Sequence, residues 1–211
     1  MNTNDLIDAL SRDAAPAEPA RHGQRAALAI GLGVAAALAL LLVTLGVRVD
    51  MWMKLPVVAA KAGFSAALAS FAALLAFRLA RPGRPAGARL WAMVGVLLLS
   101  LAVAGFALIQ TDPAARIAAW TGGAFPYCLV IIPALALPIA VGLVWVMRAM
   151  APTRLELAGG AVGALAGGLG AMVYALYCPV DSAAFVATWY ALAIALCAAV
   201  GALAGQRFLR W

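Results

Sequence analysis

The sequence predicts an all-α, polytopic membrane protein with six transmembrane helices, and three observations support this fold class. First, 66% of the 211 residues are hydrophobic and only 11% are charged, an apolar excess beyond the needs of one soluble core. Second, six apolar stretches of about 16 to 22 residues are each long enough to cross a hydrocarbon layer as a helix. Third, these stretches lack the two-residue alternation of a transmembrane barrel, and helices in lipid satisfy their own backbone hydrogen bonds.

The first element is a polar tail over residues 1–25. Thr3 or Asn4 can cap a short helix there, and Asp5 flanks its apolar face. Three residues form the apolar stripe of this helix: Leu6, Ile7 and Leu10. Because the stripe is too small to fold alone, it is typical of a docking peptide that folds against a cytoplasmic partner. Attachment to the membrane surface is the alternative, which the acidic residues disfavour beside an anionic leaflet.

The tail continues into a tether over residues 13–25, where alanines and prolines predict a flexible chain. Four acids precede the first apolar run, and that run is longer than the apolar region of a removable signal peptide. The chain therefore divides into a docking tail with its tether, residues 1–25, and a six-helix transmembrane domain, residues 26–211.

The six spans follow one another with short connections. They are expected near residues 26–47, 57–77, 90–110, 127–147, 157–177 and 189–205. Two of them carry small residues at every fourth position: Gly159, Gly163 and Gly167 in the fifth, and Ala193, Cys197, Gly201 and Gly205 in the sixth. Small residues on one face let helix backbones approach closely, so both rows predict tight packing. In the fourth span, Pro133 and Pro138 predict a kinked or locally mobile helix.

The orientation follows from the basic residues of the connecting segments, because Lys and Arg resist translocation. One side of the predicted topology holds eleven arginines, whereas the other holds Arg48, Lys54 and Arg116. Both termini are therefore expected in the cytoplasm, with the chain in a bacterial inner membrane. The formal net charge of +7 does not indicate nucleic acid, since the basic residues are spread over short segments and form no basic patch with interleaved aromatics.

Lys61 lies about one helical turn inside the outer end of the second expected span. Snorkelling of its long side chain to the interface is the favoured interpretation, and an intramembrane functional charge is the alternative. A small-solute or ion transporter that uses Lys61 as its coupling charge is accordingly the rival function. The spans contain no catalytic constellation, and the single histidine, His22, precedes them. Neither an enzyme nor a bound cofactor is therefore expected.

Two cysteines are the candidate chemical site. Cys128 opens the fourth span and Cys178 closes the fifth, so the hairpin returns both to a similar depth at the outer face. A structural disulfide, a reversible thiol switch and capture of a thiophilic metal ion all remain open. Asp181 could add an oxygen ligand, but a structural zinc site normally has four protein ligands, so metal held by Cys128 and Cys178 would be transient. Cys197 lies in a small-residue row and is expected to serve packing.

Several segments along the whole chain resemble the bacterial negative regulator of sigma-F family of membrane anti-sigma factors. They are NTNDLIDALSRDAAP, FPYCLVIIPALALP, APTR at 151–154, YCPVDSAAFVATWY at 177–190 and the closing FLRW.

The resemblance implies a six-span protein that holds an extracytoplasmic-function sigma factor through its cytoplasmic surfaces. It also implies that Cys128 and Cys178 sense heavy-metal or oxidative stress from outside the cytoplasm. Several relatives have histidine before the second cysteine where this chain has Tyr177, which weakens the expectation of metal binding. The working hypothesis is that the stripe of the tail binds the sigma factor, helped by the arginine-rich segment Arg78 to Arg89, and that modification of the two thiols releases it.

Overall fold

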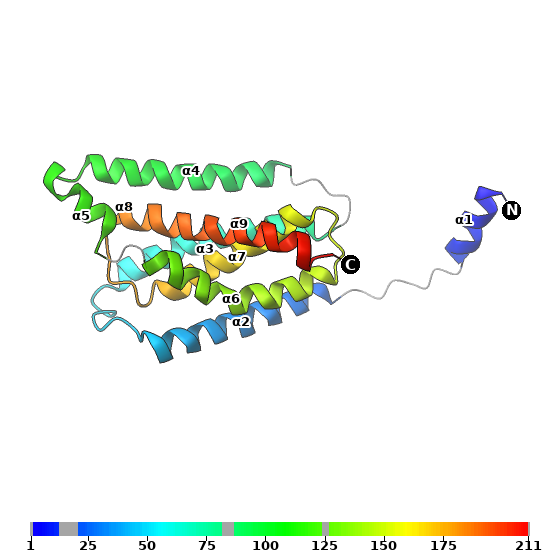
Figure 1. Ribbon diagram of the computed structural model, residues 1–211, viewed down its shortest axis with the longest axis horizontal. Helices are drawn as coiled ribbons and strands as arrows, with labels where there is room; N and C mark the ends of the chain where they lie inside the picture. The colour runs from blue at the N-terminus through cyan, green and yellow to red at the C-terminus, as the bar shows by residue number, and fades with distance from the viewer. Residues whose placement is uncertain (1, 13–20, 82–86, 124–126, 211) are drawn as a thin grey trace.

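The computed structural model describes residues 2–12, 21–81, 87–123 and 127–210, except for the side chains of Arg12 and Arg89. Most of the expected tether and Arg84 of the arginine-rich segment fall outside these ranges. Over the described residues the chain is helical, and no strand is present (Figure 1). The all-α prediction is confirmed.

Six of the described helices are long and apolar enough to cross a membrane, which confirms the predicted number of spans. The first five are α2 (His22–Thr44), α3 (Leu55–Leu79), α4 (Ala88–Ile109), α6 (Tyr127–Arg148) and α7 (Leu155–Tyr174). The sixth, Ala183–Phe208, is built from α8 (Ala183–Phe185), a π-helical segment η2 (Val186–Tyr190) and α9 (Ala191–Phe208). It begins at Ala183, earlier than expected, because Ser182 caps its first turn by accepting a hydrogen bond from Phe185 N–H.

Helix α7 lies at the centre of the bundle. Figure 1 shows it among α3, α6 and α9, with α2 and α4 at opposite edges. Of the apolar window of α7, 78% is buried, compared with 11% for α4. The core therefore surrounds the helix that has the most small residues.

The two rows of small residues meet along α7 and α9, which confirms the predicted close packing. A Cβ atom added at Gly163 would overlap the carbonyl oxygen of Cys197. One added at Gly159 would overlap the carbonyl oxygen of Gly201, and one at Gly201 would overlap that of Gly159. The backbones of the two helices are thus in direct contact, and we call this contact the α7–α9 seam.

Helix α6 runs without interruption through Pro133 and Pro138, each of which removes one backbone donor. The kink expected at these residues stays a prediction. On the neighbouring helix, a Cβ at Gly170 would lie 3.0 Å from both the carbonyl oxygen of Ile132 and the backbone nitrogen of Ala136. The α6–α7 hairpin is therefore also closely packed beside the prolines.

The tail forms helix α1 (Thr3–Arg12). Its first turn begins earlier than expected, because the carbonyl of Asn2 accepts from Leu6 N–H at 3.1 Å and the carboxylate of Asp5 accepts from Asn2 N–H at 3.1 Å. Asn2 therefore stands at the cap position, and the expectation that Thr3 or Asn4 caps the helix is wrong.

One end of the bundle gathers the connections that follow α2, α4 and α7. The connection after α4 contains η1 (Pro113–Ala115) and the short helix α5 (Arg116–Thr121). Trp189 of η2 donates its indole N–H to the carbonyl of Trp120 at 2.8 Å, and their rings lie 5.1 Å apart. The backbone N–H of Arg48 donates to the carbonyl of Leu176 at 3.1 Å. We call this the cysteine end, because Cys128 and Cys178 lie there.

Candidate functional site

Cys128 and Cys178 come together at the cysteine end, as the hairpin arrangement predicts. Cys128 is in the first turn of α6, and Cys178 follows the end of α7. Both are 0% exposed, belong to one buried cluster and lie within electrostatic range of each other. All three cysteines of the chain are free thiols. The pair can therefore react as two neighbouring thiols once a reagent reaches them.

Two tyrosines surround this thiol pair, and the sequence analysis did not identify them. The rings of Tyr174 and Tyr190 lie 5.8 Å apart, and both residues are 0% exposed. Their hydroxyl oxygens are buried and make no hydrogen bond of normal geometry with the described residues. Both hydroxyls interact electrostatically with Cys178. The two tyrosines therefore add polar groups beside Cys178 to the candidate site.

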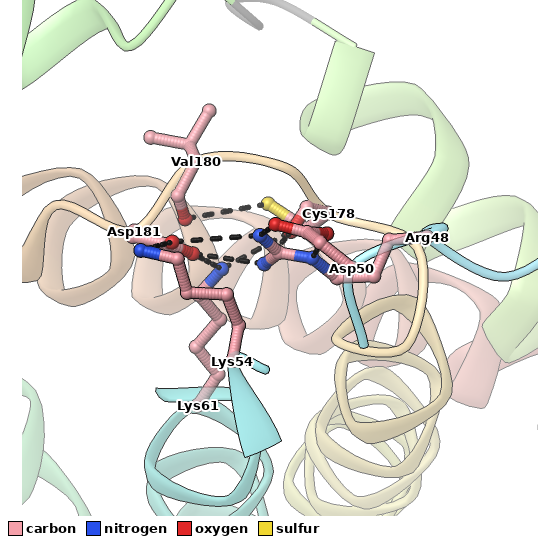
Figure 2. Close-up of polar contacts among 7 residues, drawn as sticks. All are labelled: Arg48, Asp50, Lys54, Lys61, Cys178, Val180 and Asp181. Carbon is pink, nitrogen blue, oxygen red and sulfur yellow. Dashed lines mark hydrogen bonds and ion pairs between the residues drawn. The ribbon is translucent and has the colours of Figure 1, made fainter. Parts of the chain in front are cut away.

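The backbone of Cys178 is held by two cationic side chains. Its carbonyl oxygen accepts from Lys61 Nζ at 3.1 Å and from Arg48 Nη1 at 3.1 Å (Figure 2). The same two groups donate to Oδ1 of Asp181, at 3.0 and 2.8 Å. The segment from Cys178 to Asp181 is thus fixed to α3 and to the connection after α2.

Two further charges complete the group, which we call the charge cluster: Arg48, Asp50, Lys54, Lys61 and Asp181. Arg48 makes a two-point contact with Asp50, at 2.7 and 2.8 Å. Lys54 lies 3.6 Å from Oδ2 of Asp181. The side chains of Arg48 and Lys61 are 6% and 2% exposed, so the cluster removes two cations from solvent almost completely.

The cluster also fixes the protonation of its acids. The hydrogen bond from Arg48, and then that from Lys61, holds the pKa of Asp181 well below its usual range. The bond from Arg48 likewise lowers the pKa of Asp50, while its two carboxylate partners raise the pKa of Arg48. Both carboxylates are therefore ionised at neutral pH.

These contacts give Lys61 partners that the sequence analysis did not identify. Its Nζ donates to Asp181 and to the carbonyl of Cys178, and its side chain is 2% exposed. Snorkelling to the interface stays a prediction. A cation buried in a membrane span needs a nearby counter-charge, and Asp181 supplies it across 120 residues of sequence.

The chemistry of the donors fits a thiophilic ion better than a structural zinc. Among the described residues, no group of three or more His, Cys, Asp or Glu is placed to hold a metal. Asp181 is occupied by three cations, so its service as an accessory ligand stays a prediction. Cys128 and Cys178 would supply two sulfur donors.

The remaining predicted residues lie elsewhere. Cys197 is part of the α7–α9 seam, where its Cβ is 2.8 Å from the position of a Cβ added at Gly167. The stripe of α1 is exposed, with Leu6, Ile7 and Leu10 at 42%, 57% and 64%. Asp5 accepts the hydrogen bond that caps α1, which gives it a role within the helix.

Comparison with known proteins gives a consistent result. A family model described as "Negative regulator of sigma F" matches residues 10–211. The chain is 39% identical over 216 aligned positions to the "Probable anti-sigma-F factor NrsF" of Azospira oryzae, with all of both chains covered. It is equally similar, over the same extent, to the "Anti-sigma-F factor NrsF" of Caulobacter vibrioides. No solved structure matches the chain.

Proposed function

The chain belongs to the negative regulator of sigma F family, and we propose that it is a membrane anti-sigma factor whose partner is an extracytoplasmic-function sigma factor. In this proposal, reaction of Cys128 and Cys178 with a thiophilic metal ion or an oxidant releases the partner. The observation that supports the sensing step is the pairing of two free, buried thiols, one in the first turn of α6 and one in the segment that the charge cluster holds. The role is regulatory and not enzymatic.

The sigma factor would bind the stripe of α1. Leu6, Ile7 and Leu10 leave an apolar face of the helix exposed, and an amphipathic helix commonly binds by placing such a face in an apolar groove. The arginine-rich segment from Arg78 to Arg89 would add contacts on the same, cytoplasmic side. Residues 82–86 of that segment lie outside the described part of the chain.

The chemistry at the thiols can take two forms. A divalent thiophilic ion would displace both thiol protons and form two metal–sulfur bonds. A peroxide would accept two electrons and two protons from the thiols, so that its O–O bond breaks, one S–S bond forms and two hydroxylic products leave. Both thiols are 0% exposed and therefore shielded from reagents, so either reaction requires the segment held by the charge cluster to open.

The α6–α7 hairpin would transmit the reaction. Cys128 begins α6 and Cys178 follows α7, so a bond between their sulfur atoms restrains these two helix ends relative to each other. The opposite ends of α6 and α7 meet at the connection Ala149 to Arg154, on the proposed cytoplasmic side. To invert a 1:99 population, the reaction must favour the released state by about 5.5 kcal/mol.

Retention of a sigma factor is tested by co-purification from membranes followed by mass spectrometry. The intact chain is compared with a Leu6→Asp/Leu10→Asp variant and with an Asn4→Asp/Ser11→Asp control, which adds the same charge at two polar positions and keeps the apolar side chains of the stripe. We expect the intact chain and the control to retain a sigma factor. The stripe variant should bind it at least about tenfold more weakly, which corresponds to a loss of about 1.4 kcal/mol of binding free energy. Failure of the intact chain to retain any sigma factor would refute the proposal.

Sensing is tested with the three cysteines in turn. Membranes that carry the complex are treated with cadmium ion or with hydrogen peroxide, and the released sigma factor is quantified. We expect Cys128→Ser and Cys178→Ser to block release, whereas Cys197→Ser behaves as the unchanged chain because Cys197 lies in the seam. Normal release from both of the first two variants would refute sensing by these thiols without affecting sigma retention.

Transport by a coupling charge is less well supported. Lys61 is paired with Asp181 and bonded to the carbonyl of Cys178, and the family assignment favours regulation. A transporter would keep its activity after deletion of residues 1–20 and lose it in Lys61→Ala. The anti-sigma function requires the tail.

A further inference from the structure

A groove of about 590 Å³ runs between α3 and α4 and ends at the start of the sixth span. Its walls are almost entirely apolar, with Phe64, Phe71, Leu99 and Val103 among the lining residues. Three of these, Phe71, Leu99 and Val103, are 37%, 63% and 47% exposed. Because both helices are membrane spans, the groove opens sideways toward lipid.

The groove is elongated along α3. Its lining residues on this helix run from Val57 to Phe71 and recur once per helical turn, with Ala60 and Lys61 sharing one turn, so they follow one face of the helix. The stretch from Lys61 to Phe71 alone is about 15 Å long at the rise of an α-helix. A long, narrow apolar channel that is open to the bilayer fits an extended hydrocarbon chain.

One end of the groove is charged. Lys61 and Asp181 both line it there, and Lys54, which is 49% exposed, lies 3.6 Å from Asp181. The charge cluster contains three cations and two carboxylates, so one positive charge is in excess. This end therefore complements an anionic group, and exposed Lys54 is the cation best placed to meet it.

We infer that the groove binds one acyl chain of an anionic phospholipid, whose phosphate lies against Lys54 at the charged end. The hydrocarbon fills the space between α3 and α4, and the phosphate balances the excess charge of the cluster. The occupant is a bilayer component because the groove opens into the bilayer and combines a long apolar channel with a cationic end. The lipid would contact Lys61 and Asp181, which hold the segment of Cys178, but its binding does not depend on the anti-sigma function.

Lipid binding is measured by native mass spectrometry of the full chain. The protein is delipidated in detergent and mixed with phosphatidylglycerol or with phosphatidylcholine of the same acyl composition. We expect one tightly retained phosphatidylglycerol and at least fivefold weaker retention of phosphatidylcholine. Ala67→Phe, which places a ring in the groove, should lower phosphatidylglycerol retention at least tenfold. Ala36→Phe is the matched control, because Ala36 is exposed on α2 away from the groove.

The headgroup contact is tested by Lys54→Gln, which should reduce the preference for phosphatidylglycerol toward unity while some binding through the acyl chain persists. Equal retention of the two lipids by the unchanged protein would overturn the anionic assignment. Unchanged retention in Ala67→Phe, or equal losses in Ala67→Phe and Ala36→Phe, would overturn the location.

A second measurement locates the lipid without a mutation. Phosphatidylglycerol with a photoreactive diazirine in its acyl chain is bound to the unchanged protein and irradiated, and the labelled peptides are sequenced. We expect labels on α3 and α4, at lining residues such as Phe71 and Leu99. Labels that avoid both helices would overturn the inference even if a lipid is retained. Both measurements use the protein without a sigma factor, so their failure leaves the proposed function untouched.

Discussion

Helices α7 and α4 both offer 20-residue apolar spans, yet 78% of the window of α7 is buried and only 11% of that of α4. Their mean hydropathies are in the opposite order, 1.5 for α7 and 2.6 for α4. The more hydrophobic helix therefore faces outward. A large apolar side chain gains no hydrophobic free energy by moving from lipid into the protein interior. Small residues, in contrast, allow helix backbones to come into contact.

The difference extends to how each helix is held. Helix α7 meets α9 through backbone atoms along the seam, so its position tolerates no added atom at several glycines. Helix α4 borders the open groove, and the connection that follows it is fastened by the tryptophan pair at the cysteine end. One helix is fixed by continuous contact and the other by a few specific contacts. Four predictions test this contrast, from the largest expected effect to the smallest.

The largest effect is expected at the seam. Gly163→Ala should lower the free energy of unfolding by about 3 kcal/mol, at the upper end of overpacking costs, because the new methyl overlaps the carbonyl of Cys197 and forces the helices apart. Gly105→Ala in α4 is the matched control, since a Cβ there meets nothing within 4 Å, and it should change stability by less than about 1 kcal/mol. Thermal unfolding in detergent measures both. Equal losses would contradict the contrast.

The next effect is expected at the charge cluster, which fastens the Cys178 segment to α3. Asp181→Asn should destabilise the fold by about 1–3 kcal/mol, because it leaves buried Lys61 without its counter-charge. The reactivity of Cys178 with a maleimide should rise together with this loss. Asp50→Asn is the control, and its effect should be smaller because Asp50 is more exposed. A larger loss of stability in Asp50→Asn than in Asp181→Asn would show that Asp50 is the principal anchor of the segment.

The third effect is the pH dependence of the stability that Asp181 contributes to the fold. Because pairing lowers the pKa of Asp181 in the folded state, its stabilisation is present above the ordinary carboxyl pKa of about 3.9 and is lost as pH falls through the folded value. The stability difference between the unchanged chain and Asp181→Asn should be constant above about pH 5 and shrink below about pH 4. Unfolding titrations at a series of pH values measure it. A difference that grows in acid would show the opposite linkage.

The smallest effect is expected at the contact between Trp189 and Trp120, which holds the connection after α4. Trp189→Phe removes the hydrogen bond to the carbonyl of Trp120 but keeps an aromatic ring, so a loss of about 0.5–1.5 kcal/mol is expected. Hydrogen exchange should increase in α5 and leave the α7–α9 seam unchanged. Faster exchange in the seam as well would show that the two regions are not held independently.

Much of this architecture was predictable from local sequence. Long apolar runs predicted the six spans, and the four-residue rows predicted the seam, because both depend on spacing within one segment. Sequence reasoning also placed Cys128 and Cys178 at one end, since a hairpin returns to its starting depth. These inferences need only helix geometry and topology.

The charge cluster and the tyrosines required knowledge of long-range contacts. Lys61 and Asp181 are distant in sequence, and only the packing of α3 beside the connection after α7 brings them together. The demand of a membrane cation for a counter-charge could have suggested the pairing. No comparable signal distinguishes Tyr174 and Tyr190 from other aromatic residues. The groove forms because α4 packs less closely than α7 against the rest of the bundle. No residue spacing in the sequence predicts this difference.

The seam also has a consequence for biosynthesis. Since α9 follows α7 in the sequence, α7 leaves the ribosome before the partner for its glycine face has been synthesised. Until α9 arrives, lipid must cover the glycine face of α7 that later contacts the backbone of α9. Docking of α9 against α7 is therefore the step of assembly that replaces lipid with protein on this central helix.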